Sequence, residues 1–304
     1  MTSNEIINNL AVPIGKIDVV IDSDAYNEID DQFAISYLLR SKEKLNTVAI
    51  YAAPFFNPHS NGPEDGMLKS YNEIKKLLSL LDEEREVYKG SKRYLIDENT
   101  PVVSPAAEDL ARRAMTYSPK NPLYVVAIGA ITNVASAILL NPEIKDNIVV
   151  VWLGGHALHY HDAKEFNLKQ DVAAARVVIN SKVPFVQLPC NGVVSSFTVS
   201  KYDLEKWLLG KSVIADYLAK NAIREVEEFE GICDVPWSRC IWDVTAVAWL
   251  LNDNNRFMLS RIVPAHLPTY DNFYTLNPNG HPISYVYFIK RDELLADLFK
   301  KLSK

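Results

Sequence analysis

Residues 17–39 read IDVVIDSDAYNEIDDQFAISYLL, and this stretch decides the fold. It opens with a short β-branched run, residues 17–21, of the kind that forms a buried strand. A polar loop follows, and residues 31–39 then carry apolar side chains at helical spacing. A strand, a loop and a helix in this order are typical of α/β folds, in which helices cover a parallel sheet.

The same alternation continues along the chain. Further strands are predicted at residues 47–51, 123–128, 148–153 and 183–188, and further helices at residues 68–81, 132–140 and 173–179 and from Ser104-Pro105 onward. The strands are continuously apolar, which indicates a sheet buried on both faces. No linker, repeat or abrupt change of composition interrupts the 304 residues. We therefore predict one α/β domain over residues 1–304, with a mostly parallel, Rossmann-like central sheet flanked by helices.

Composition argues against several classes of protein. The net charge of −6 gives no sign of the basic face that binds nucleic acid. No apolar run is long enough to cross a bilayer, and residues 1–15 lack the features of a signal peptide. Cys190, Cys233 and Cys240 are odd in number and widely spaced, which suits a reducing compartment. We expect a cytoplasmic protein that binds neither nucleic acid nor membrane.

The loop at residues 22–31 is dense in carboxylates. They belong to Asp22, Asp24, Glu28, Asp30 and Asp31. Asp22 and Asp24 follow a strand, at the edge where parallel sheets bind ligands, and Asp30-Asp31 opens a helix, where free amides stabilise negative charge. So many like charges in one concave site are unfavourable unless a cation or raised pKa values relieve them. A hard divalent cation is the natural relief, and calcium accepts irregular oxygen sites more readily than magnesium.

Two other acidic features say little when taken alone. Asp243 precedes the apolar residues 244–251, and an aspartate in that place is more often a helix cap than a ligand. Glu165-Phe166-Asn167 lies in a polar loop after a predicted strand.

Together these motifs resemble the nucleoside hydrolase family. The family's Asp-x-Asp-x-x-x-Asp-Asp loop is similar to the one formed by Asp22, Asp24, Asp30 and Asp31, which has two additional residues. Residues 129–133, GAITN, resemble its Gly-Pro-Leu-Thr-Asn segment, and residues 153–155, LGG, resemble its Met-Gly-Gly. Residues 165–167 match its Glu-Phe-Asn, and Asp243 matches its late metal-binding aspartate. The resemblance implies the nucleoside hydrolase fold and calcium-dependent hydrolysis of ribonucleosides to free base and ribose.

The resemblance also implies roles for individual residues. Calcium is expected to bind Asp24, Asp31, Asp243 and the backbone carbonyl of Ile128. The small-molecule ribonucleoside is expected to contact Asp30, Asn57, Leu153, Glu165 and Asn167. Asp24 is in addition the expected acceptor of a proton from the attacking water. Members of the family are often dimers or tetramers, so a homodimer or homotetramer is compatible with the resemblance.

Trp242 stands where many family members have a histidine that protonates the departing base. An aromatic residue there resembles the purine-specific branch, in which it assists catalysis by stacking on the base. Stacking stabilises a protonated purine through an attraction related to cation–π interaction, worth ~0.5–2 kcal/mol. A place in the core fits the spacing of Trp242 equally well. His59, His156, His159 and His161 remain alternative acids, and His156 is the best placed of them.

Two alternative functions stay open on the sequence. Asp22-Ser23-Asp24 resembles the Asp-x-Asp loop of haloacid-dehalogenase-like phosphatases, with Asp22 as nucleophile and magnesium as cofactor. Tyr26 stands where that pattern usually has threonine or valine. The second alternative is a non-catalytic homologue that binds ribose or nucleosides, because the histidine acid is missing.

Overall fold

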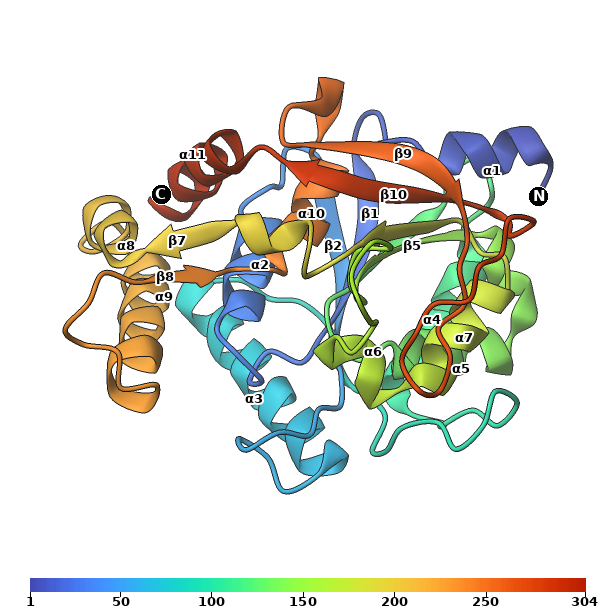
Figure 1. Cartoon of the computed structure of the whole chain (residues 1–304), viewed down its shortest axis with the longest axis horizontal. Coiled ribbons are helices and arrows are strands. Elements are labelled where there is room, and N and C mark those ends of the chain that lie inside the picture. The colour runs from blue at the N-terminus through green and yellow to red at the C-terminus, as the bar shows by residue number, and fades with distance from the viewer.

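An eight-stranded sheet forms the centre of the computed structural model, which describes residues 1–304 apart from the side chain of Ser3 (Figure 1). Its strand order is β3-β2-β1-β4-β5-β6-β10-β9. The strands are β1 (Ile17–Ser23), β2 (Leu45–Ala52), β3 (Val87–Lys89), β4 (Leu123–Ala127), β5 (Ile148–Leu153), β6 (Phe185–Leu188), β9 (Met258–Pro264) and β10 (Pro282–Ile289). All neighbours pair in parallel except β10 and β9, which are antiparallel. The mostly parallel α/β sheet is therefore confirmed.

Helices cover both faces of this sheet. They are α1 (Ser3–Asn9), α2 (Asp30–Leu39), α3 (Pro63–Leu81), α4 (Pro105–Arg113), α5 (Thr132–Leu140), α6 (Phe166–Gln170), α7 (Val172–Asn180), α8 (Lys201–Trp207), α9 (Val213–Arg224), α10 (Val244–Leu250) and α11 (Arg291–Leu302). A five-residue π-helix, Glu225–Phe229, extends α9. A small antiparallel sheet pairs β7 (Thr198–Ser200) with β8 (Ser238–Cys240). Short 3-10 turns lie at Ala114–Thr116, Pro142–Asp146, Val194–Ser196 and Asp253–Asn255.

Strand β1 shows why the sheet is buried on both sides. Val19 and Ile21 belong to a core shared with α2, α3, α9, α10 and α11, whereas Val20 belongs to a second core shared with α4, α5 and α7. Successive side chains of a strand point to opposite faces, so a strand between two layers must be apolar throughout. Burial on both faces is therefore the physical reason for the run of β-branched residues from which this strand was predicted.

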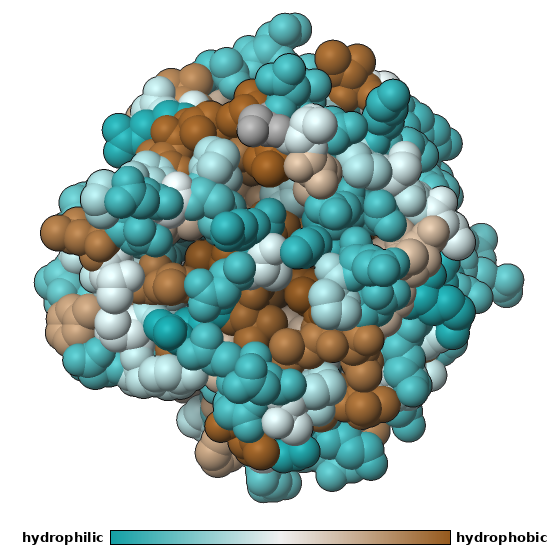
Figure 2. Space-filling model, turned by 90° about the vertical axis from the view of Figure 1, so that its right-hand side faces the viewer, coloured by the Kyte–Doolittle hydropathy of each residue, from teal (hydrophilic) through white to brown (hydrophobic). Residues whose placement is uncertain are grey.

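The surface is mixed in character. Figure 2 shows the right-hand side of the molecule in Figure 1, where hydrophobic residues gather in patches between hydrophilic ones. Among the described helices, none is both long and apolar enough to span a membrane. That residues 1–304 make up one domain stays a prediction.

Candidate active site

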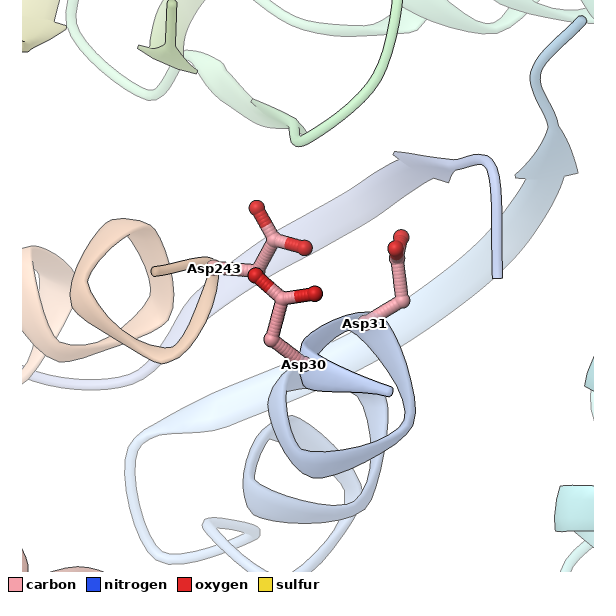
Figure 3. Close-up of side chains that lie close together, drawn as sticks. All are labelled: Asp30, Asp31 and Asp243. Carbon is pink, nitrogen blue, oxygen red and sulfur yellow. The ribbon is translucent and has the colours of Figure 1, made fainter. Parts of the chain in front are cut away.

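Three carboxylates from distant parts of the sequence meet at the carboxyl edge of the parallel strands (Figure 3). Asp30 and Asp31 are the first residues of α2, and Asp243 directly precedes α10. One oxygen of each lies within 4.8 Å of the others, and all three side chains are buried. Of the three aspartates that the sequence predicted to converge, Asp31 and Asp243 belong to this group, and Asp30 takes the third place instead of Asp24.

The carboxylate of Asp243 is free to serve this site. Asp243 occupies the N-cap position of α10, but its side chain makes no capping hydrogen bond. Figure 3 shows it directed toward Asp30 instead. On the other side of the group, the Ser23 hydroxyl donates to Oδ1 of Asp31 at 2.5 Å and so fixes that carboxylate. The helix-cap interpretation of Asp243 accounts for its position in the chain, but not for where its oxygens point.

Asp24 is fully buried beside these carboxylates, at the turn after β1. A Cβ at Gly129 would lie only 2.8 Å from Oδ1 of Asp24, so the side chain packs on a backbone that must be glycine. Among the described residues, neither oxygen of Asp24 and only one of Asp22 finds a hydrogen-bond donor. Buried carboxylates without partners are strongly unfavourable, so these residues fit a bound hard cation.

The tightest trio of carboxylates contains Asp30, whereas the family resemblance assigns the metal to Asp24 together with Asp31 and Asp243. Asp24 lies close enough to repel both Asp31 and Asp30 electrostatically. Its two orphaned oxygens favour Asp24 as the ligand, because a ligand for a cation needs lone pairs that no protein donor uses.

The pKa values of the cluster show how much charge the site must balance. Burial raises the pKa of Asp22 and of Asp30 to about 7. Burial, followed by repulsion from neighbouring carboxylates, raises the pKa of Asp24, Asp31 and Asp243 well above the usual range. Without a cation the site can relieve this repulsion only by taking up protons.

A pocket of about 270 Å³ opens onto the cluster. The predicted site residues in its wall are Asp30, Ile128, Leu153, Glu165, Asn167, Trp242 and Asp243. Among the residues that the structure describes, Asp22, Asp24 and Asp31 lie behind this wall and are not part of it. Unlike Asp24, Asp22 is engaged by the protein, since its Oδ1 accepts a hydrogen bond from Asn133 at 2.8 Å. This arrangement does not suit Asp22 as the nucleophile of a phosphatase.

Comparison with known proteins identifies the family of the chain. The family model described as inosine-uridine preferring nucleoside hydrolase matches residues 19–275. The chain belongs to the nucleoside hydrolase family. This confirms the predicted family and its enzyme class, an N-ribohydrolase that acts on N-glycosyl bonds of nucleosides. No curated protein sequence matches the chain.

Solved structures of nucleoside hydrolases have the same fold. The purine-preferring ribonucleoside hydrolase from Gardnerella vaginalis is 18% identical, with a TM-score of 0.77 over 94% of this chain and 98% of that one. The plant nucleoside hydrolase PpNRh1 is also 18% identical, with a TM-score of 0.72 over 94% and 99%. The type III effector XopQ, complexed with adenosine diphosphate ribose, is 15% identical, with a TM-score of 0.69 over 100% and 99%. At these identities the likeness concerns the fold.

Asn167, in the nucleoside hydrolase Glu-Phe-Asn motif, presents one defined end of its amide to the pocket. Its Nδ2 donates to the carbonyl of Ile128 at 3.2 Å and to that of Leu153 at 3.1 Å. Its Oδ1 has no partner among the described residues and can accept a hydrogen bond from a ligand. The Ile128 carbonyl, predicted to bind calcium, lies at the same wall, and this role stays a prediction.

Glu165 is held by the backbone around it. Its carboxylate accepts N–H groups from Gly155 at 2.9 Å and from Asn167 and Leu168 at 2.8 Å each, so it caps α6. These bonds fix the carboxylate at the pocket wall and leave lone pairs for a substrate hydroxyl.

Asn57 is, besides Asp24 and Asp31, a predicted site residue outside the described pocket wall. In the part of the chain that the structure describes, it lies outside the pocket wall, and its side chain bonds to Asn27, which lies within it. Sequence reasoning did not assign Asn27. No motif along the chain points to it, and only the hydrogen bond from Asn57 identifies it.

Trp242 and His156 are the two candidates for assisting the leaving group. Trp242 lines the pocket and also packs against the core, and its stacking on a base stays a prediction. His156 is buried, which lowers its pKa, and its Nδ1 accepts the backbone N–H of Asn191 at 3.3 Å. A neutral imidazole that accepts at Nδ1 carries its proton at Nε2. His59, His159 and His161 do not belong to the described wall of this pocket.

Proposed function

We propose that the chain is a calcium-dependent ribonucleoside hydrolase that prefers purine bases. The observation that carries the calcium part is the fully buried Asp24, whose two oxygens lack donors beside Asp30, Asp31 and Asp243. Asp24, Asp31 and Asp243 would hold the ion, with the carbonyl of Ile128 as a further oxygen ligand. Several carboxylates and a carbonyl in an irregular arrangement suit calcium better than magnesium.

Bound calcium would supply the Lewis acidity that polarises water and ribose hydroxyls. Asp24 is the proposed proton acceptor from the attacking water. Neither of its oxygens accepts a hydrogen bond from the described residues, so a lone pair is available for that proton.

The remaining polar groups of the pocket are suited to bind ribose and to stabilise the positive charge that develops on it. Asp30 and Oδ1 of Asn167 are acceptors for ribose hydroxyls, and Glu165 adds a third fixed acceptor. Hydrolysis of a glycosidic bond passes through an oxocarbenium-like state, which nearby carboxylates stabilise. Deoxyribonucleosides should therefore react poorly.

The proposed purine preference rests on Trp242 in the pocket wall. An indole ring can stack on a purine over a larger area than on a pyrimidine and can stabilise the protonated base. Two structures with this fold are described as a purine-preferring ribonucleoside hydrolase and an inosine-guanosine nucleoside hydrolase, which supports the same preference here. Release of free base suits a role in purine salvage and nucleoside catabolism.

The direct test is base release from a panel of ribonucleosides, followed by chromatography with and without a chelator. We expect turnover of inosine and guanosine to exceed that of uridine, and we expect the chelator to stop it until calcium is restored. Release that is indifferent to the chelator would contradict the calcium part. Tight nucleoside binding with no base released would instead support a non-catalytic binding protein.

A further inference from the structure

We propose that Asn27 is a substrate-binding residue whose side-chain NH2 donates a hydrogen bond to a ribose hydroxyl, and that Asn57 orients it. The inference rests on the proposed function, since it takes the ribosyl group as the ligand of this pocket.

The backbone places Asn27 between the carboxylates of the site. Its N–H donates to the carbonyl of Asp24 at 2.7 Å, which closes a tight turn immediately after β1. The chain then enters α2 at Asp30. Asn27 is only 8% exposed, and it lines the pocket that Asp30 and Asp243 also line. Asn27 also lines a neighbouring pocket of about 190 Å³ on the side of His59, so it lies in the wall between the two.

A chain of hydrogen bonds fixes which end of the Asn27 amide faces the pocket. The backbone N–H of His59 can only donate, and it donates to Oδ1 of Asn57 at 2.9 Å. The other end of the Asn57 amide is therefore NH2, and its Nδ2 lies 2.6 Å from Oδ1 of Asn27. Because the oxygen of Asn27 is occupied in this way, its own NH2 is the free end.

The free NH2 of Asn27 has no acceptor among the described residues, although carboxylates are abundant in the same pocket. Asp30, Asp243 and Oδ1 of Asn167 all present acceptors there. A hydroxyl group donates one hydrogen bond and also accepts, so a ribose hydroxyl that donates to a carboxylate still needs a donor. Asn27 is the proposed donor.

The relay also explains how Asn57 can matter without touching the ligand. Asn57 lies outside the described pocket wall, and its NH2 additionally lies 3.4 Å from the backbone carbonyl of Asn27. Asn57 is therefore a positioning residue, which holds both the backbone and the side chain of Asn27. Asn57, which was expected to bind substrate itself, thus acts on the substrate through Asn27.

Calorimetric titration with sugars tests the proposal independently of turnover. The ligands are D-ribose, 2-deoxy-D-ribose and 3-deoxy-D-ribose, and the calcium-loaded proteins are wild type, Asn27→Ala, Asn57→Ala and Asn57→Asp. Asn27→Ala should weaken ribose about 3- to 10-fold, the effect of one hydrogen bond. For the deoxy sugar that lacks the contacted hydroxyl, wild type and Asn27→Ala should bind equally well.

The Asn57 variants separate positioning from contact. Asn57→Ala should weaken ribose less than Asn27→Ala does, because the Asn27 amide is then free but still present. Asn57→Asp offers only acceptors, so Asn27 should turn its NH2 toward residue 57 and lose as much ribose affinity as in Asn27→Ala. Asn61→Ala, at an exposed asparagine of the same loop, is the matched control and should bind like wild type.

Three results would overturn the proposal: unchanged ribose affinity in Asn27→Ala, an equal loss for ribose and both deoxy sugars, or a wild-type protein that binds no ribose. Thermal midpoints of all variants show whether each is folded, and the comparison among sugars remains decisive for a destabilised one. Failure to release base from any ribonucleoside defeats the proposed function, whereas sugar binding still decides the role of Asn27.

Discussion

One carboxylate oxygen of Asp243 lies within 4.8 Å of one of Asp31, although the two residues introduce different helices, α10 and α2, that are far apart in the sequence. Two buried carboxylates at this separation repel each other unless positive charge lies between them. Packing α10 against α2 thus creates a site that is unfavourable when empty of cations and protons.

The metal-free protein should lose stability as the pH rises. The pKa of Asp22 and of Asp30 is about 7 in the folded protein, against about 4 for an aspartate in an unfolded chain. Between about pH 4 and about pH 7 these groups bind more protons in the folded state, so their contribution to stability falls with rising pH. In chelator, the thermal midpoint should therefore be lower at about pH 7.5 than at about pH 5.5.

Asp22→Asn tests the origin of this pH dependence. The variant keeps a side chain of the same shape and removes one group with a raised pKa, so its midpoint should fall less steeply with pH than that of wild type. Calcium should flatten the pH dependence of both proteins. A wild-type midpoint that rises with pH in chelator would show that these carboxylates are not strained in the folded state.

Replacing Asp24 should abolish turnover and leave the fold intact. Asp24→Ala removes the proposed proton acceptor and a metal ligand, and loss of a general base alone lowers turnover about 100- to 10,000-fold. Removing a buried carboxylate without donors should not destabilise the protein. Steady-state kinetics on inosine and circular dichroism check the two parts. Near-normal turnover in Asp24→Ala would exclude Asp24 as the proton acceptor.

Trp242→Ala should reduce the preference for purines. Loss of a stacking contact worth ~0.5–2 kcal/mol corresponds to a fall of about 2- to 30-fold in kcat/KM for inosine. Uridine, with its smaller ring, should lose less, and Trp242→Phe should retain part of the inosine activity. Since Trp242 also packs against the core, thermal midpoints must accompany the kinetics. A wild-type enzyme that strongly prefers uridine would defeat the proposal.

The sequence predicted the central strands well because burial on both faces leaves a strong signal. The strand expected at residues 148–153 is β5 (Ile148–Leu153), and the helix expected at residues 132–140 is α5 (Thr132–Leu140). Strands β9 and β10 were not predicted. They lie at the antiparallel edge, where Arg261 and Tyr287 face solvent and interrupt the apolar run.

Those residues of the candidate site that belong to recognisable sequence motifs could be predicted. Asp24, Asp31 and Asp243 were expected to converge; the structure brings Asp31 and Asp243 together with Asp30, and a shared ion with Asp24 stays a prediction. The partner of Asn57 was not predictable, because it depends on how two loops pack against each other rather than on any spacing along the chain. Asn27 could be identified only from the hydrogen bond that joins these loops.

Titration of chelated protein with calcium in a calorimeter tests the central claim most directly, since it measures whether the distant carboxylates share one ion. We predict a single site per chain in wild type, and at least about tenfold weaker binding in Asp243→Asn, where a charged ligand becomes neutral. Asp253→Asn, at an exposed aspartate after α10, should bind like wild type. Calcium affinity in Asp243→Asn equal to that of wild type would contradict the account.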